Sequence, residues 1–155
     1  MPEYSAVAAQ TVNPGESIVF SLDSTDICSQ FIRHRDETGN FLLSGFVPNR
    51  RRTCCCKPRT AEYLVDFGAN IAIPTGGTIG EISVALAVDG TTIPASLMAV
   101  TPAAVEERFN VSRAITVPIW QGCCQTVSIR NTSDQPIEVT NANVIFARPD
   151  LQSIF

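Results

Sequence analysis

Lysine and histidine are almost absent from this chain of 155 residues, which holds one of each, Lys57 and His34. Charged residues make up 17% of the sequence, against about a quarter in an ordinary soluble domain. The net charge is −4, so the chain as a whole is not a generic binder of polyanions. With a single histidine and no recognisable catalytic signature, we expect that the protein is not an enzyme.

Long hydrophobic runs are also missing. No apolar stretch approaches the ~18 residues that a membrane-spanning helix needs, and the N-terminus lacks the basic and apolar segments of a signal peptide. We therefore expect synthesis in the cytoplasm without a signal peptide. The apolar fraction of 45% excludes wholesale disorder. We predict a single domain over residues 1–155, with flexible ends at about 1–10 and 150–155.

No stretch has the apolar periodicity of a long helix. Short runs rich in Val, Ile, Thr and Phe are separated by Gly, Pro, Asn and Asp instead, which is typical of an all-β sandwich or barrel. We predict an antiparallel β-sandwich of the jelly-roll type with eight to nine strands. Its core is expected to hold one side chain from each of several strands: Phe20, Ile32, Leu43, Leu64, Ile82, Leu86, Val127 and Phe146.

Turn residues place several of the strand boundaries. Asp89 and Gly90 predict a tight hairpin between a strand at 79–88 and a return strand at 93–100. The small residues that alternate with Ile, Val and Leu along 79–88 indicate burial on both faces of that strand. A strand is also expected at 16–22, and a helical turn at 103–108, for which a strand is the alternative.

Three local motifs that resemble catalytic or binding signatures fail on physical grounds. The sequence His34-Arg35-Asp36 matches the start of a kinase catalytic loop, but the later metal-binding Asn and the Gly-rich loop are missing. Glu106 and Glu107 are adjacent, whereas hydrolases need two carboxyls that face each other across a cleft. The glycine cluster at 76–80 precedes a strand rather than a helix, so it predicts a tight turn with positive φ and not a phosphate loop.

Six cysteines give no metal or redox motif. None forms a Cys-x-x-Cys pair, so a zinc ribbon or a thioredoxin-type site is disfavoured, and we expect no cofactor and assign no metal ligand. Disulfides within or between chains, free thiols and, less favoured, a metal site stay open. The candidates for disulfides or thiols are Cys28, Cys54, Cys55, Cys56, Cys123 and Cys124.

Positive charge is concentrated in one part of the chain. Residues 33–59 carry a net charge of +5, and the remainder carries −9. We expect a cationic, cysteine-rich loop at 48–59, which is either solvated, in contact with a neighbouring subunit, or docked on an acidic surface. Nucleic-acid binding is disfavoured because 48–59 holds no aromatic residue for stacking. The docking-patch candidates are Arg33, Arg35, Arg50, Arg51, Arg52, Lys57 and Arg59.

The turn and strand motifs also carry a family resemblance. Several segments resemble small structural proteins of phages and prophages of gut Firmicutes. They are NIAIPTGGTIG (70–80), ISVALAVDG (82–90), VTPAAVEE (100–107), ITVP (115–118), GCC (122–124) and VSIRNT (127–132). The start of the chain, QTV (10–12) and GESIVF (15–20), is similar to the jelly-roll domains of bacterial collagen-like surface proteins, which have folds similar to C1q and tumour necrosis factor (TNF).

This resemblance implies a trimer-prone jelly roll displayed on a particle or cell surface, and it implies no catalytic residue. The Gly-X-Y repeats of collagen-like relatives are absent. The first hypothesis is therefore a non-enzymatic structural protein of a phage virion, a capsid decoration or head-fibre subunit. Its partners would be itself, as a homo-oligomer and most simply a trimer, and the major capsid protein or other virion proteins, with no membrane insertion.

Two other hypotheses stay open. The chain could be a subunit of an extracellular filament or spore appendage that assembles head to tail and is locked by interchain disulfides. A carbohydrate-binding module is the third, although it would need a groove lined by aromatic residues. Under the virion hypothesis and the filament hypothesis, the protein functions outside the cell, where disulfides persist.

Overall fold

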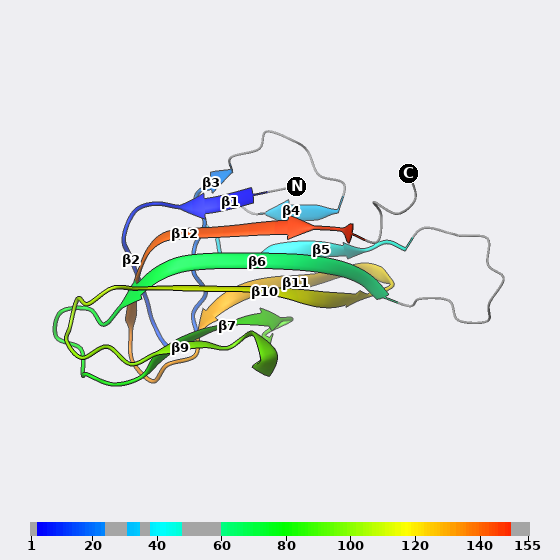
Figure 1. The fold of residues 1–155 in the computed structure, drawn as a ribbon. Helices are drawn as coiled ribbons and strands as arrows, with labels where there is room; N and C mark the ends of the chain where they lie inside the picture. Colours follow the sequence, from blue (N-terminus) through cyan, green and yellow to red (C-terminus); the bar gives the residue numbers. More distant parts are fainter. Residues whose placement is uncertain (1–2, 24–30, 35–37, 48–59, 150–155) are drawn as a thin grey trace.

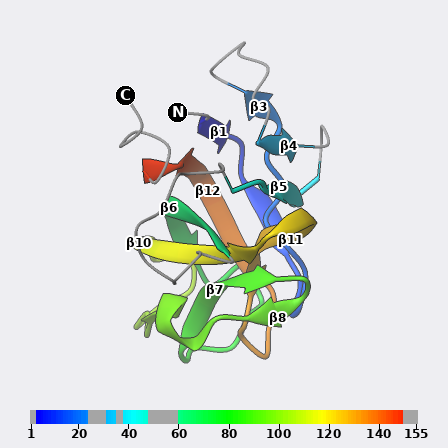
Figure 2. The same ribbon diagram turned by 90° about the vertical axis from the view of Figure 1, so that its right-hand side faces the viewer.

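The computed structural model describes residues 3–23, 31–34, 38–47 and 60–149, apart from the side chains of Asp23 and Cys123. Two antiparallel sheets of six strands pack face to face in this part of the chain (Figures 1 and 2). Sheet A holds β1 (Glu3–Ala6), β2 (Gln10–Val12), β3 (Leu22–Asp23), β6 (Thr60–Ala72), β10 (Phe109–Trp120) and β12 (Ile137–Ala147). Sheet B holds β4 (Ile32–His34), β5 (Phe41–Gly45), β7 (Ile82–Val88), β8 (Thr91–Thr92), β9 (Met98–Val100) and β11 (Gly122–Asn131).

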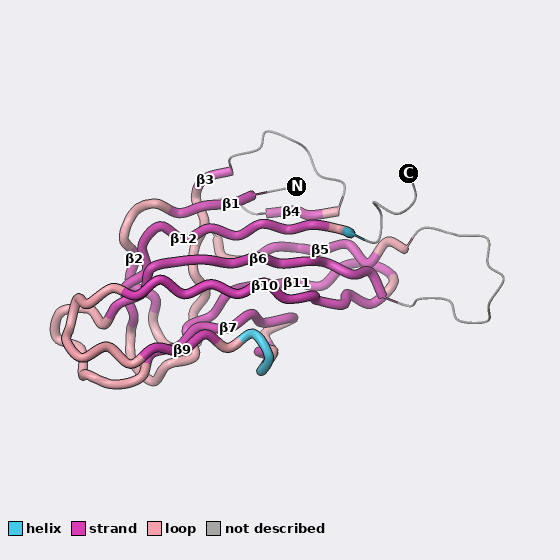
Figure 3. The backbone as a smooth tube through the Cα atoms, in the orientation of Figure 1, coloured by secondary structure: helices cyan, strands magenta, loops and turns pink. Residues whose placement is uncertain are grey.

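Strand order explains how the two sheets are built. Sheet A runs β10-β6-β12-β1-β3, with β2 also paired to β12, and sheet B runs β4-β5-β11-β7-β8, with β9 also paired to β7. The predicted all-β antiparallel sandwich is confirmed (Figure 3). The described part has twelve strands rather than eight or nine, because five of them are only two or three residues long.

The core lies between the sheets and follows the period of two that strands impose. All but one of the eight predicted core residues are buried. The exception is Leu64, whose side chain is 39% exposed. Its neighbours Tyr63 and Val65 are completely buried. The prediction was wrong by one residue, and a one-residue slip in a strand moves a side chain to the opposite face.

The β7 strand is buried on both faces, as its small residues predicted. The hairpin at Asp89 and Gly90 is also confirmed, with φ of 49° and 86° at these residues. The expected return strand at 93–100 is wrong. Within it, only β9 pairs with β7, after the 3₁₀ turn η1 (Pro94–Ser96), in which the Ser96 hydroxyl accepts a hydrogen bond from the Leu86 amide at 2.8 Å.

Two other predicted elements differ from the structure. Residues 103–108 form bends and a turn, neither a helix nor a strand. Glu106 there has φ of 62°, and its amide donates to the Ile73 carbonyl at 2.7 Å, which holds the segment against the end of β6. The stretch 16–22 is not one continuous strand. It pairs with sheet B through Ser17 and then joins sheet A as β3, so it crosses between the sheets.

Tyr63 and Arg148 join the two sheets at one end of the sandwich. The Tyr63 hydroxyl, from β6 in sheet A, lies 2.6 Å from the Ser44 carbonyl and 3.2 Å from the Phe31 carbonyl. Arg148 is 8% exposed, lies over the rings of Phe31 and Tyr63, and donates to the Phe46 carbonyl at 3.0 Å. A buried cation on aromatic faces and a buried phenol therefore both bridge from sheet A to sheet B.

At the ends of β7 and β11, Asp89 connects two hairpins. The Thr126 amide donates to its carboxylate at 2.9 Å, and the Gln125 side chain donates at 3.0 Å. These two hydrogen bonds, that of Thr126 first, lower the pKa of Asp89 below its ordinary value of 3.8. Because the Gln125 side chain also accepts from the Trp120 amide, the β7–β8 and β10–β11 turns are held together.

The first prediction concerns the hydrogen bonds by which Tyr63 links sheet A to sheet B. We expect Tyr63→Phe to lower the free energy of unfolding by about 1–2 kcal/mol, because the hydroxyl is lost while carbonyls that accepted its hydrogen bonds stay behind. Urea denaturation measures this change. Val7→Ala, at a side chain outside β6 that is 61% exposed, is the control and should cost less than about 0.5 kcal/mol. Equal stability of Tyr63→Phe and the unsubstituted protein would contradict the account.

The second prediction concerns Asp89. Its folded-state pKa lies below 3.8, so its carboxylate stabilises the fold above that pH, and the contribution is lost as the pH falls through the folded-state pKa. Asp89→Asn keeps a residue that tolerates positive φ, so the turn should persist. We expect its melting temperature to be lower by about 1–3 °C at pH 7, with the gap closing below pH 3.8. A gap that is constant with pH would contradict this assignment.

Candidate functional site

The outer face of sheet A is the first candidate surface. Strand pairing places the side chains in rows: Leu64 lies opposite Thr116 and Ala147, and Asp66 lies opposite Ala114 and Ile145. All of these side chains point away from the core, because they alternate with buried ones. We call this surface the sheet A face, and it consists of Thr60, Glu62, Leu64, Asp66, Ala114, Thr116, Pro118, Trp120, Ile145 and Ala147.

This face is mostly uncharged and has exposed apolar side chains. Trp120 is 64% exposed, and Leu64 contributes a second exposed large apolar side chain. Its charged members are Glu62 and Asp66, and it includes no lysine or arginine. Asp66 is exposed and has no hydrogen-bonding or ionic partner among the described residues. A large aromatic ring and few charges are the composition of protein–protein interface centres.

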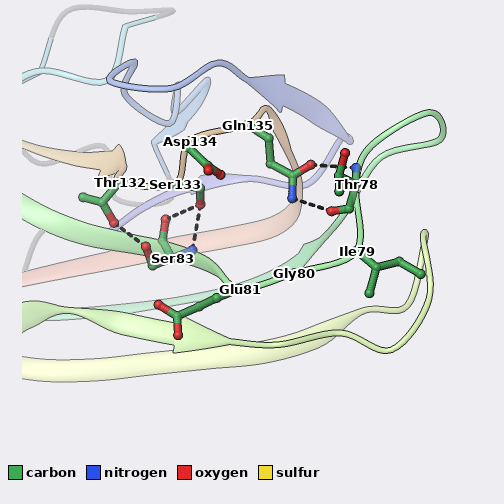
Figure 4. Close-up of a pocket in the computed structure, with 9 residues that line it drawn as sticks. All are labelled: Thr78, Ile79, Gly80, Glu81, Ser83, Thr132, Ser133, Asp134 and Gln135. Atoms are coloured by element: carbon green, nitrogen blue, oxygen red, sulfur yellow. Dashed lines mark hydrogen bonds between the residues drawn. The ribbon is translucent and has the colours of Figure 1, made fainter.

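A shallow recess is the second candidate (Figure 4). It has a volume of about 600 Å³ and lies where β7 begins and the β11–β12 turn passes. Its lining residues are Thr78, Ile79, Gly80, Glu81, Ser83, Thr132, Ser133, Asp134 and Gln135.

Most polar groups of this recess bind one another. The Gln135 side chain accepts from the Thr78 amide at 2.9 Å and donates to the Thr78 carbonyl at 2.7 Å. The Ser133 hydroxyl accepts from the Ser83 amide at 2.8 Å, and the hydroxyls of Ser83 and Thr132 lie 2.7 Å apart. No histidine or cysteine lines the recess, and the hydroxyls of Ser83, Thr132 and Ser133 bind one another and the backbone in place of its carboxylates.

The glycine cluster at 76–80 forms part of this recess as a turn. Gly76 has φ of 87°, as predicted for a tight turn. A Cβ at Gly77 would lie 2.5 Å from the Ile73 side chain, so only glycine fits there. Across the described residues, no group of three or more His, Cys, Asp or Glu side chains could hold a metal ion.

His34 serves the packing of sheet B and the core. Its ring stacks on Phe41 with centroids 4.6 Å apart, and its Nε2 lies 2.9 Å from the Thr38 carbonyl oxygen. The Tyr4 ring is 4.9 Å from it on another side. These contacts account for the half-buried imidazole without any catalytic partner in the described part of the chain.

Most of the docking and thiol candidates fall outside the described residues. Of the seven cations, Arg33 is described, and it is exposed on β4. Of the six cysteines, the described side chain is that of Cys124, which is half-buried in β11 and disulfide-bonded. Arg35, the cations at 50–59, Cys28 and the cysteines at 54–56 are not among the described residues.

Sequence reasoning missed the sheet A face. The signal was present in the alternation of 63–73, which places Leu64 and Asp66 on one face and Tyr63 and Val65 on the other. The strand was assigned correctly but its inward side was not. Among the described residues, no helix is long and apolar enough to cross a membrane.

Known proteins resemble this chain in structure but not in sequence. No family model matches the sequence, and no curated protein matches it significantly. Solved structures do match: the globular domain of zebrafish complement 1qA has a TM-score of 0.57 at 12% identity, covering 93% of this chain and 94% of that one. The Eiger TNF of S. frugiperda has a TM-score of 0.68 at 9% identity, covering 95% of this chain and 90% of that one. The chain therefore has the jelly-roll β-sandwich fold of C1q and TNF-like domains.

Proposed function

We propose that this protein is a non-enzymatic structural module that works as a closed homotrimer, with the sheet A face buried between copies. The observation that carries the proposal is that face itself. It presents an exposed tryptophan, an exposed leucine and no lysine or arginine. Contiguous exposed apolar surface of this kind marks an interaction site in a soluble protein.

The fold supports a second copy as the occupant of the sheet A face. C1q and TNF-like domains typically trimerise, and both solved neighbours match over nearly the whole of this chain. A closed ring of three copies would cover the exposed apolar side chains of every subunit. The described residues offer no cluster of metal ligands, and the hydroxyls of the recess bind one another and the backbone.

The proposal also includes the location at which the protein functions. Work outside the cytosol rests on the resemblance in the sequence, and disulfides among the six cysteines would persist in such an environment. Decoration of a phage virion is the finer form of the proposal and rests on the resemblance in the sequence alone. The names of the two solved neighbours refer to animal proteins, and neither refers to a virion.

A disulfide-locked filament is the competing assembly. The filament hypothesis depends on disulfides between copies, and the side chains of five of the six cysteines, at 28, 54–56 and 123, lie outside the described residues. A closed trimer needs no covalent lock, whereas the filament hypothesis depends on one. The two assemblies therefore differ in size distribution and in their response to reductant.

The third prediction tests this difference. Light scattering after size exclusion should give a discrete mass of three chains, about 50 kDa from the chain mass of 16.7 kDa, with and without reductant. An open-ended distribution that shortens in reductant would overturn the trimer in favour of the filament. A monomer at all concentrations would overturn both.

One substitution links the trimer to the proposed face. Leu64→Asp should dissociate the trimer at least tenfold more readily and leave the fold intact, because Leu64 is exposed in the single chain. The matched control is Ile79→Asp, since Ile79 is 57% exposed but lies in the recess. Circular dichroism checks folding and light scattering checks mass. A Leu64→Asp protein that remains trimeric would contradict the assignment of this face.

A further inference from the structure

Asp66 makes burial of the sheet A face costly. Its carboxylate lies between Ala114 and Ile145 in the strand register, with Leu64 and Gly68 before and after it on the same face. None of these neighbours is a cation. A carboxylate that is removed from water without a partner destabilises an interface. An assembly that covers this face therefore needs a cation opposite Asp66.

Arg113 is placed to supply that cation from another copy. It lies on β10, the edge strand of sheet A, in register with the buried Phe67. Its side chain is exposed although its position in the alternation of β10 is on the core side of sheet A, and β10 lies next to β9 of sheet B. Its one hydrogen bond is to the Ala95 carbonyl in η1, at 3.0 Å.

The other described arginines are less suited to this role. Arg108 is paired with Glu138 at 3.0 Å, and Arg148 is buried at the join of the sheets. Arg130 is half-buried on sheet B, with its Nε atom enclosed. Arg33 is exposed, but it lies on β4, an edge strand of the other sheet. Arg113 alone among the described arginines is an exposed side chain at the free edge of sheet A.

The two residues lie on different surfaces of one subunit. Asp66 is on the face of sheet A, and Arg113 is on its edge strand β10, where it binds the Ala95 carbonyl of η1. Leu97, which is 43% exposed, directly follows η1. A contact between different surfaces of identical chains is heterologous, and it closes into a ring when the rotation between copies allows. The edge of β10 and the adjoining η1 turn present a cation and an apolar side chain, Arg113 and Leu97. The sheet A face presents a carboxylate and an apolar side chain, Asp66 and Leu64.

From this complementarity we infer that Arg113 of each copy forms an ion pair with Asp66 of the next, with the edge of β10 packed on the neighbouring sheet A face. The inference rests on the proposed trimer and names the contact within it. Interfacial charge pairs of this kind set the register between partners and select against wrong arrangements. The exposed carboxylate of Asp66 thereby acts as a specificity residue for assembly.

A charge exchange tests the pair. Asp66→Arg and Arg113→Asp should each weaken the trimer at least tenfold, because each places like charges together. The double variant restores opposite charges with the positions exchanged, and it should return to within about threefold of the original affinity. Analytical ultracentrifugation over a dilution series measures the dissociation. Arg33→Asp, an exposed arginine on the other sheet, is the control and should leave the trimer unchanged.

A second double-mutant cycle uses uncharged substitutions, which are less disruptive to folding than a reversal of charge. Asp66→Asn and Arg113→Gln should each weaken assembly, and the double variant should be no weaker than the worse single one. If the original protein is monomeric, the proposed function itself fails. If the original protein is trimeric and neither cycle shows coupling, the ion pair is overturned while the trimer stands. Coupling between Asp66 and Arg33 instead would also overturn the assignment of Arg113.

Discussion

The alternation of side chains along β6 is the constraint on which the rest of this structure depends. This strand of 13 residues lies between β10 and β12 in sheet A, so it is paired along both of its edges. Tyr63, Val65 and Phe67 are completely buried on its inner side, where they fill the space between the sheets. Because a strand has a period of two, the same backbone must present Leu64 and Asp66 to the outside. The packing of the core and the chemistry of the candidate interface are thus set by one register.

The two ends of the sandwich keep that register fixed. At one end, the Tyr63 hydroxyl and the Arg148 guanidinium reach from sheet A to carbonyls of the chain around β4 and β5. Near the recess, the buried Asn131 side chain donates to the Val12 and Gln135 carbonyls at 2.9 Å, which joins β2 to the β11–β12 turn. These polar groups are paired inside the protein, so they specify one arrangement of the sheets. These contacts hold β6 in the register that exposes Leu64 and Asp66 on the sheet A face.

Sequence patterns predicted the fold class, the hairpin at Asp89 and the double burial of β7, because each follows from local periodicity or turn chemistry. The side to which Leu64 points was predicted wrongly, although the pattern contains the signal: Leu64 shares its face with Asp66, whereas Tyr63 and the other buried residues of β6 lie on the opposite face. Within 93–100, Pro94 lacks the N–H that a strand ladder needs, and the 3₁₀ turn begins there. The hydrogen bond from the Leu86 amide to the Ser96 hydroxyl adds a contact that the local pattern does not show. Arg113 was likewise missed, because its importance comes from the edge position of β10 and not from its neighbours in the sequence.

The central claim is that the sheet A face is covered by a second copy of the chain. Trp120 is the only tryptophan in the sequence, and its side chain lies on this face with 64% of its surface exposed in the single chain. Its fluorescence therefore reports directly on the face. The most direct measurement is the emission and acrylamide quenching of Trp120 across a dilution series that dissociates the assembly. The account predicts blue-shifted, poorly quenched emission in the assembly and red-shifted, readily quenched emission after dilution. An assembled protein whose tryptophan remains fully accessible to the quencher would contradict it.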